Sequence, residues 1–454
     1  MFVWPYGWAF TRVRGGALGL AIATGCGGRA TLFVMSSNKN KKWPWAVGIV
    51  ALAAVAGVAG TGVWVQHELR DLEHAPAFSM AAPEPLPVQV ASPEGVDRAG
   101  LAEKLAAQAS NEALGTLHVR VSDGVTGQTV FEQQAGEPLQ PASATKVLTA
   151  AAALYTLEPD ATVTTEVLRQ GDAVTVKAAG DVWLTRADLD ELAATIGSAS
   201  AVYVDKGVWP EEPLMPGWDP SDIGAGFIAP MEPIMVGGGR LDGETRGDVP
   251  RTHTPALDVA QALAERVGAA TVGFGPAPAG GEVVATVESP PLMERLRAMM
   301  KDSDNVMAEA IGREIARARG GTSPQATLDT LVEHGFDITG VTLADSSGLS
   351  QLNLIPPRLL DDVMVRATTN ELRDLLTTLA VAGGDGTLVD RYGELPGKGW
   401  VHAKTGTLTG TSALVGTVTS KVGNVYTFAM ISNGSDVMTA RMLMDEFAST
   451  LREY

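Results

Sequence analysis

A run of 23 uncharged residues, from Trp43 to Val65, most constrains how this chain of 454 residues can fold. As a helix at about 1.5 Å per residue it would reach roughly 35 Å, which is long enough to cross a bilayer. Basic and aromatic residues flank the run, as they do at membrane interfaces: Lys39, Lys41, Lys42, Trp43, Trp45 and Trp64. We predict an uncleaved transmembrane anchor at 43–65; the alternatives are a buried core helix and a signal peptide cleaved after 75–77.

Charge divides the chain at the same place. Residues 1–65 contain six basic and no acidic residues, whereas residues 66–454 contain 28 basic and 52 acidic residues. The positive-inside rule then places the acidic part outside the cytoplasm, so we predict a single-pass protein of the cell membrane. The net charge of −18 argues against a nucleic-acid partner.

The numbers of cysteines and histidines limit the disulfides and metal sites that the chain can form. Cys26 is the only cysteine, which excludes an intrachain disulfide framework, a thiolate zinc site and an iron–sulfur cluster. Six scattered histidines, without an H-E-x-x-H motif, disfavour a histidine metal site. A carboxylate site for calcium or magnesium stays open on this ground alone.

The segments around the anchor have separate characters. Residues 1–42 form a cytoplasmic or upstream segment, in which the residues before Cys26 resemble a lipobox with Ala in place of Leu. Because a full anchor follows, we interpret Met35 as the translation start. Residues 66–95 hold prolines at 76, 83, 85, 87 and 93 and predict a semi-extended stalk. The globular part begins near Val96.

The first chemical motif is the S-x-x-K spacing of Ser143 and Lys146. Pro141 suits a helix start and residues 147–154 are typical of a buried helix, so both side chains share one face at its N-terminus. Burial and the helix dipole would lower the pKa of Lys146 toward a value that suits a general base. Alone the motif is weak, since an N-cap serine and a surface lysine have the same spacing.

Ser303-Asp304-Asn305 is the second motif. It lies between helical patterns at 292–299 and 306–315, at a turn where side chains converge. A plain helix cap is the alternative interpretation.

The third motif is Lys404-Thr405-Gly406. It lies on a strand-like run at 400–408, ahead of strands predicted at 413–419 and 426–431. An edge-strand lysine before a turn is the alternative. The order S-x-x-K, S-x-N, K-T-G is much rarer by chance than any single motif, and it is typical of penicillin-binding proteins and class A β-lactamases.

The chain resembles the low-molecular-mass class C penicillin-binding proteins, which are D-alanyl-D-alanine carboxypeptidases and endopeptidases. The resemblance covers about residues 97–454 and rests on six stretches: 140–154, 217–240, 289–310, 345–350, 384–388 and 403–408. It implies an α/β penicillin-recognising serine DD-peptidase fold, with an antiparallel sheet flanked by helices, an all-helical subdomain and an inserted α/β domain. It implies no cofactor and no metal.

The insertion can be placed from the spacing. Ser143 and Ser303 are 160 positions apart, more than a helix pair needs, and the family is known for a domain inserted there. Strand patterns at 162–168, 173–177 and 201–205, a capping box at Thr185 and Asp188, and a helix at 257–267 predict an α/β module. We place the insert at 160–285 and the catalytic domain at 96–159 and 286–454.

The resemblance implies a role for each motif residue. Ser143 would attack the carbonyl between two terminal D-alanines to give an acyl-enzyme, and Lys146 would take its proton. Ser303 would relay the proton to the leaving amine, while Asn305 would hold Lys146 or the substrate backbone.

Substrate binding would fall to the third motif. Lys404, Thr405 and Thr407 would bind the free C-terminal carboxylate, and Gly406 would let the strand approach the substrate. Backbone N–H groups of Ser143 and Thr407 would form the oxyanion hole. The expected partners are peptidoglycan stem peptides ending in D-Ala-D-Ala, and β-lactams that acylate Ser143.

Other functions stay open at this point. A β-lactamase-like hydrolase would need an E-x-x-L-N loop, which is absent between Asn305 and Lys404. A Ser-His-Asp hydrolase is disfavoured because the chain has no G-x-S-x-G motif. A catalytically decayed wall-binding protein is the non-enzymatic alternative. The balance between carboxypeptidase and endopeptidase activity stays open as well.

Overall fold

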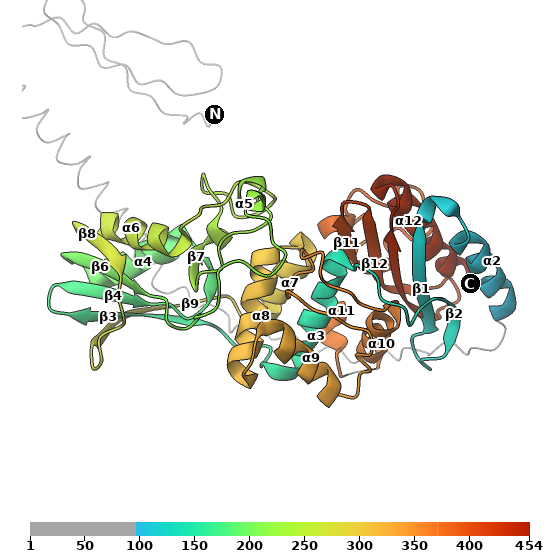
Figure 1. Cartoon of the computed structure of the whole chain (residues 1–454), viewed down its shortest axis with the longest axis horizontal. Helices are drawn as coiled ribbons and strands as arrows, with labels where there is room; N and C mark the ends of the chain where they lie inside the picture. Colours follow the sequence, from blue (N-terminus) through green and yellow to red (C-terminus); the bar gives the residue numbers. More distant parts are fainter. Residues whose placement is uncertain (1–96, 370) are drawn as a thin grey trace, which may run out of the picture. The chain divides into compact units, whose positions relative to one another are not determined.

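The computed structural model describes residues 97–369 and 371–454 (Figure 1). The predicted upstream segment, anchor and stalk lie outside these residues. Within the described residues, none of the helices has the length and apolar character needed to span a bilayer.

The central element is a six-stranded antiparallel sheet in the order β10-β11-β12-β13-β1-β2. Its strands are β1 (Thr116–Asp123), β2 (Thr129–Gln133), β10 (Ala380–Val381), β11 (Val401–Leu408), β12 (Thr411–Thr419) and β13 (Val425–Asn433). The strands predicted at 400–408, 413–419 and 426–431 are confirmed, with shifts only at their ends.

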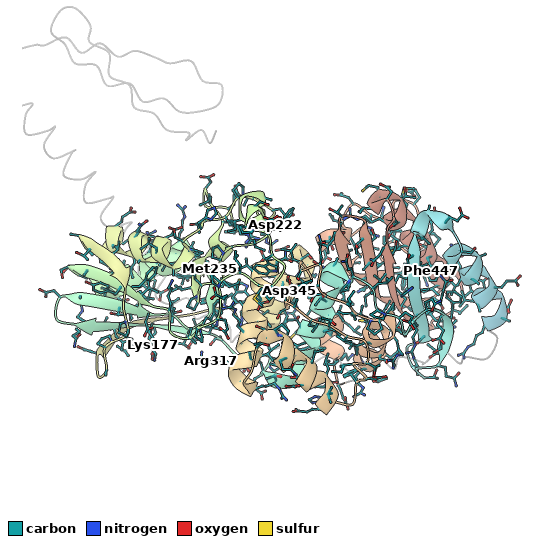
Figure 2. The ribbon with its side chains drawn as sticks, viewed as in Figure 1. Lys177, Asp222, Met235, Arg317, Asp345 and Phe447 are labelled. Atoms are coloured by element: carbon teal, nitrogen blue, oxygen red, sulfur yellow. The ribbon has the colours of Figure 1, made fainter. Side chains whose placement is uncertain are left out.

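Both faces of this sheet are buried, as successive residues of β12 illustrate. Ala413 and Val415 pack with a helical subdomain, whereas Leu414 faces a second core with helices α2 (Arg98–Ala109) and α12 (Val437–Glu453). Side chains alternate across a strand, so a strand covered on both sides is apolar throughout. Phe447 of α12 lies in the second core (Figure 2).

The helical subdomain forms the largest core. Its helices are α3 (Lys146–Thr156), α7 (Leu292–Asp302), α8 (Asn305–Arg319), α9 (Ser323–Glu333), α10 (Pro357–Thr368) and α11 (Arg373–Leu376). The run Ala150–Ala153 of α3 is completely buried, and its small side chains let α8 and α9 approach closely. The helix predicted at 147–154 is confirmed.

Residues 164–288 contain a second sheet, in the order β8-β6-β4-β3-β9. Its strands are β3 (Thr164–Gln170), β4 (Ala173–Lys177), β6 (Ala201–Asp205), β8 (Thr271–Phe274) and β9 (Glu282–Glu288). Strands β4, β6 and β8 pair in parallel, and β3 pairs antiparallel with β4 and β9. Strand β9 continues past residue 285, because its last residue Glu288 still pairs with Thr164, so the sheet extends beyond the predicted domain boundary.

Helices α4 (Arg186–Ile196) and α6 (Pro255–Val267) share an apolar core with this sheet. The predicted capping box is confirmed, since Asp188 N donates to Thr185 Oγ1 at 3.2 Å and Thr185 N donates to Asp188 Oδ2 at 2.7 Å. The same region also contains β5 (Asp181–Leu184), α5 (Ser221–Ala225) and β7 (Ile234–Val236), with β5 and β7 paired in parallel.

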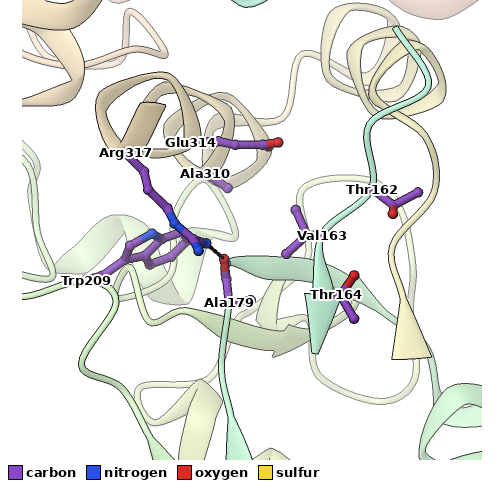
Figure 3. A pocket seen from close by; sticks show the side chains of 9 residues that line it. Thr162, Val163, Thr164, Ala179, Trp209, Ala310, Glu314 and Arg317 are labelled. Carbon is purple, nitrogen blue, oxygen red and sulfur yellow. Dashed lines mark hydrogen bonds between the residues drawn. The ribbon is translucent and has the colours of Figure 1, made fainter. Parts of the chain in front are cut away.

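A small cavity of about 260 Å³ lies where α8 meets the start of β3 (Figure 3). Trp209, Glu314 and Arg317 line it, and Arg317 Nη1 donates to Ala179 O at 3.5 Å. Its lining contains none of the three sequence motifs. This cavity therefore belongs to the packing between the helical subdomain and the inserted residues.

Candidate active site

Ser143 lies on a short 3-10 turn, Ala142–Thr145, that leads directly into α3. The sequence predicts Ser143 and Lys146 on one helical face; the structure places Ser143 on this tighter turn and Lys146 at the first residue of the helix. Ala142 has φ of 48°, a left-handed conformation that is unusual for a residue other than glycine. Backbone strain of this kind persists where surrounding contacts hold it, often at functional sites.

Lys146 is completely buried and donates three hydrogen bonds. Its Nζ lies 3.0 Å from Ser143 Oγ, 2.7 Å from Asn305 Oδ1 and 2.7 Å from the Ser347 carbonyl oxygen. Burial lowers the pKa of Lys146 to about 8, although the carboxylates of Asp345, Asp304 and Asp248 oppose the shift. The amine is therefore poised near neutral pH beside the serine hydroxyl.

The predicted turn between two helices is confirmed: Ser303 ends α7, and Asn305 is the first residue of α8. Ser303 has φ of 58° and ends α7, and Asp304 caps α8 by accepting from Met307 N at 2.8 Å. Asn305 Oδ1 accepts from Lys146, while its Nδ2 donates to the Phe227 carbonyl at 3.1 Å. Of the two partners that sequence left open for Asn305, the structure shows Lys146.

Asp304 sits in a buried cluster with two arginines from the inserted region. Arg251 Nη2 lies 2.8 Å from Asp304 Oδ2, and Arg240 pairs with the same oxygen. Burial alone would raise the pKa of Asp304, but Arg251 and Arg240 hold it well below its ordinary value. The motif turn is thus attached to the inserted region through three charged groups.

Lys404 comes from β11 and is also buried. Its Nζ donates to Ser303 Oγ at 2.8 Å and to the Thr405 carbonyl at 2.8 Å. Burial and the nearby Lys146 cation lower the pKa of Lys404 well below its ordinary value. Thr405 Oγ1 donates to Thr387 Oγ1 at 2.8 Å, so a third segment joins the site.

The loop 345–350 provides the Ser347 carbonyl that accepts a hydrogen bond from Lys146. Asp345 is buried, and its two carboxylate oxygens accept hydrogen bonds from Trp218 Nε1, Ser347 N, Ser347 Oγ, Gly348 N, Ser350 N and Asn353 Nδ2. This arrangement fixes the direction of the Ser347 carbonyl that accepts from Lys146. Figure 2 labels Asp345.

Two glycines allow the elements of the site to approach each other. A Cβ on Gly406 would lie 2.5 Å from the Pro141 carbonyl oxygen, and one on Gly348 would overlap the Ala142 carbonyl. From the sequence we expected Gly406 to let the substrate approach the strand. In the structure, Gly406 instead lies against the turn that carries Ser143. Any side chain here would displace that turn.

These residues surround a cavity of about 710 Å³. Ser143, Ser303, Asn305, Thr405 and Thr407 all line it, so the structure brings the three motifs to one place. Its lining also includes four acidic and two basic residues: Asp219, Asp222, Asp248, Asp302, Arg391 and Arg441. The cavity can therefore hold a polar peptide beside the Ser143 hydroxyl.

The family model "D-Ala-D-Ala carboxypeptidase 3 (S13) family" matches residues 101–252 and 241–454. The chain therefore belongs to this family. A protein named carboxypeptidase DacB from Mycolicibacterium smegmatis is 41% identical over 447 residues, covering 90% of this chain and 96% of the relative. The D-alanyl-D-alanine carboxypeptidase of an Actinomadura species is 28% identical over 436 residues, covering 74% of this chain and 81% of that protein.

A solved structure gives the same fold. The crystal structure of penicillin binding protein 4 (dacB) from Haemophilus influenzae aligns with a TM-score of 0.66 at 21% identity, covering 79% of this chain and 100% of that one. The fold predicted for the globular part is thus confirmed as a penicillin-binding protein fold. As an S13 family member, the chain is a serine-type D-Ala-D-Ala carboxypeptidase and a penicillin-binding protein.

Several residues of the site had no role assigned to them from the sequence. Asp345, Thr387 and the Ser347 carbonyl lie in stretches that carried the family resemblance without an assigned role. Arg441, whose Nη2 donates to Thr407 Oγ1 at 2.6 Å, lies in α12 outside every motif. No local pattern marks such a residue, because only the packing of α12 brings it to β11.

Proposed function

We propose that this S13 family enzyme works through an acyl-enzyme on Ser143, with Lys146 as the general base. The observation that carries the proposal is the set of three hydrogen bonds made by Lys146 Nζ. An ammonium group has three protons, and all three are used here. Asn305 Oδ1 and the Ser347 carbonyl can only accept, so the proton facing Ser143 is the one that can be lost.

Once deprotonated, Lys146 presents its lone pair to the Ser143 hydroxyl. The Ser143 proton moves to Lys146 Nζ as Oγ bonds to the carbonyl carbon of the penultimate D-alanine. The C–N bond to the terminal D-alanine then breaks. Ser303 gives a proton to the leaving amine and regains one from the relay that starts at Lys146, so Ser303 is again a hydroxyl and Lys146 is again neutral. Ser303 Oγ accepts from Lys404, which leaves its own hydrogen free to be donated. Water then hydrolyses the acyl-enzyme.

A fluorescent penicillin tests this mechanism. We expect covalent labelling of the wild-type protein and of Ser110→Ala, a control at an exposed serine of the chain. Ser143→Ala should take no label, because β-lactams would acylate that hydroxyl. Labelling that survives in Ser143→Ala would contradict the nucleophile assignment. Absent labelling of a folded wild type would favour a decayed wall-binding protein.

The proposed substrates are peptidoglycan stem peptides, and both trimming and cross-link cleavage are proposed activities. Mass spectrometry of muropeptides after treatment separates them. Loss of one D-alanine from monomers reports carboxypeptidase activity, and conversion of dimers to monomers reports endopeptidase activity. Unchanged muropeptides, with Ser143 still labelled by penicillin, would contradict the choice of substrate.

We further propose that residues 43–65 anchor the enzyme in the cell membrane with its catalytic part outside the cytoplasm. The uncharged run and the basic residues before it support this proposal. Cell fractionation should recover the full chain with membranes, and a chain lacking residues 1–65 should be released. Protease added to spheroplasts should degrade the catalytic part; protection from it would contradict the orientation.

A further inference from the structure

Two arginines line the active-site cavity, and their partners differ. Arg391 pairs with both oxygens of Asp445, at 3.0 and 2.7 Å. Arg441 donates from Nη2 to Thr407 Oγ1 at 2.6 Å and from Nη1 to Met438 Sδ at 3.8 Å. Its Nε is buried without a partner, and across residues 97–454 as described, no carboxylate forms an ion pair with it.

The position of Arg441 beside Thr407 follows from the packing of α12. This helix packs against β12, the neighbour of β11 in the sheet (Figure 1). Thr405 and Thr407 are two residues apart on β11, so their side chains lie on one face, and both line the cavity. Because Thr407 Oγ1 accepts from Arg441, its own hydrogen is free to point toward a ligand.

We propose that Arg441, together with Thr407, binds the free C-terminal carboxylate of the substrate and so determines specificity for a carboxy-terminal peptide. The proposal rests on the function proposed above and deepens it. A guanidinium group offers several N–H donors in a planar fork that matches a carboxylate. Lys404, the cation first expected to fill this role, already donates to Ser303 and to its own strand.

Charge explains why a second cation is needed. Burial and Lys146 lower the pKa of Lys404 well below its ordinary value, and Lys404 Nζ already donates to Ser303 Oγ and to the Thr405 carbonyl. Arginine keeps its proton throughout the working pH range. Burial and the Arg391 cation also lower the pKa of Arg441, although Asp445 opposes this shift. An anion bound here would therefore compensate a cation that the described protein leaves unpaired.

Matched substrates test the proposal in the full chain. The first pair is an acyl-D-Ala-D-Ala peptide and the same peptide with a terminal carboxamide; the second is benzylpenicillin and its methyl ester. Arg441→Gln should lower kcat/KM for the acid, and the acylation rate with benzylpenicillin, by about 10- to 100-fold. Reaction with the amide and the ester should change by less than about twofold, because they lack the anion.

Control variants separate binding from structure. Arg441→Lys should keep part of the acid preference, since it retains the charge without the fork. Met442→Ala, at the exposed neighbouring position, and Arg373→Gln, an equal charge change outside the cavity, should behave as wild type. Equal losses of kcat/KM on the acid and the amide, or no loss on either, would overturn the role of Arg441. The acyl-enzyme proposal would still stand in that case if Ser143 is labelled by penicillin. A folded wild type with neither labelling nor turnover would overturn both proposals.

Discussion

Lys146 and Lys404 are two buried lysines at one cavity, yet their surroundings differ. Carboxylates of Asp345, Asp304 and Asp248 act on Lys146 and partly offset its burial, so its pKa falls only to about 8. For Lys404, burial and the neighbouring Lys146 cation act in the same direction. The comparison shows that nearby carboxylates, rather than depth of burial, decide which lysine is suited to exchange a proton near neutral pH.

The largest expected effect comes from removing the proposed general base, Lys146. Lys146→Met should lower the acylation rate by about 10³-fold, because Lys146 is the only side chain among residues 97–369 and 371–454 that is hydrogen-bonded to Ser143 Oγ. Stopped-flow acylation with a chromogenic β-lactam measures this loss. Lys421→Met, at an exposed lysine paired with Glu453 at 2.6 Å, is the matched control. Acylation within tenfold of wild type would show that Lys146 is not the base.

The largest expected effect on stability concerns Asp345, the carboxylate that holds the loop beside Lys146. Asp345→Asn replaces an acceptor oxygen by an amide donor among six buried donors, so the free energy of unfolding should fall by about 3 kcal/mol. Urea unfolding measures the change. Asp329→Asn, on an exposed part of α9, should change stability by less than about 0.5 kcal/mol. Equal effects of the two substitutions would contradict the support that we assign to Asp345.

A smaller loss of activity is expected when Lys404 is replaced. Lys404→Met removes the amine that donates to Ser303, and kcat/KM for a carboxy-terminal peptide should fall by about 30-fold. The loss should lie partly in KM, whereas that of Lys146→Met should lie in the chemical step. Steady-state kinetics on one peptide separates the two. Identical kinetic patterns would mean that the two lysines act as one unit.

The smallest expected effect concerns pH. Lys146 must be neutral to accept a proton, so the acylation rate should rise with pH and level off above about 8. Asp248 raises the pKa of Lys146, so Asp248→Asn should move this rise to lower pH by a few tenths of a pH unit at low salt.

Salt and a second aspartate provide the controls for this shift. Asp248 is exposed, so high salt should screen its effect, and Asp172→Asn, an exposed turn residue between β3 and β4, should cause no shift. A rise that moves to higher pH in Asp248→Asn would reverse the sign of the electrostatic argument.

Local patterns predicted much of the fold. Alternation at 413–419 marked a strand, the alanine-rich run after Lys146 marked a helix, and Thr185 with Asp188 marked a helix start. Each pattern involves residues within one or two turns, where backbone geometry alone sets which side chains share a face. The end of the second sheet was less predictable, since Glu288 is a strand residue through its pairing with Thr164.

The sequence by itself determined where the three motifs lie, because S-x-x-K, S-x-N and K-T-G each span only three or four neighbouring residues. Only the tertiary structure decided how they are supported. The Ser347 carbonyl reaches Lys146 across 201 positions, and Arg441 reaches Thr407 across 34. Such contacts depend on how several helices pack on one sheet, which no local spacing encodes. The same packing buries Lys146, which lowers its pKa, and it places an arginine beside Thr407.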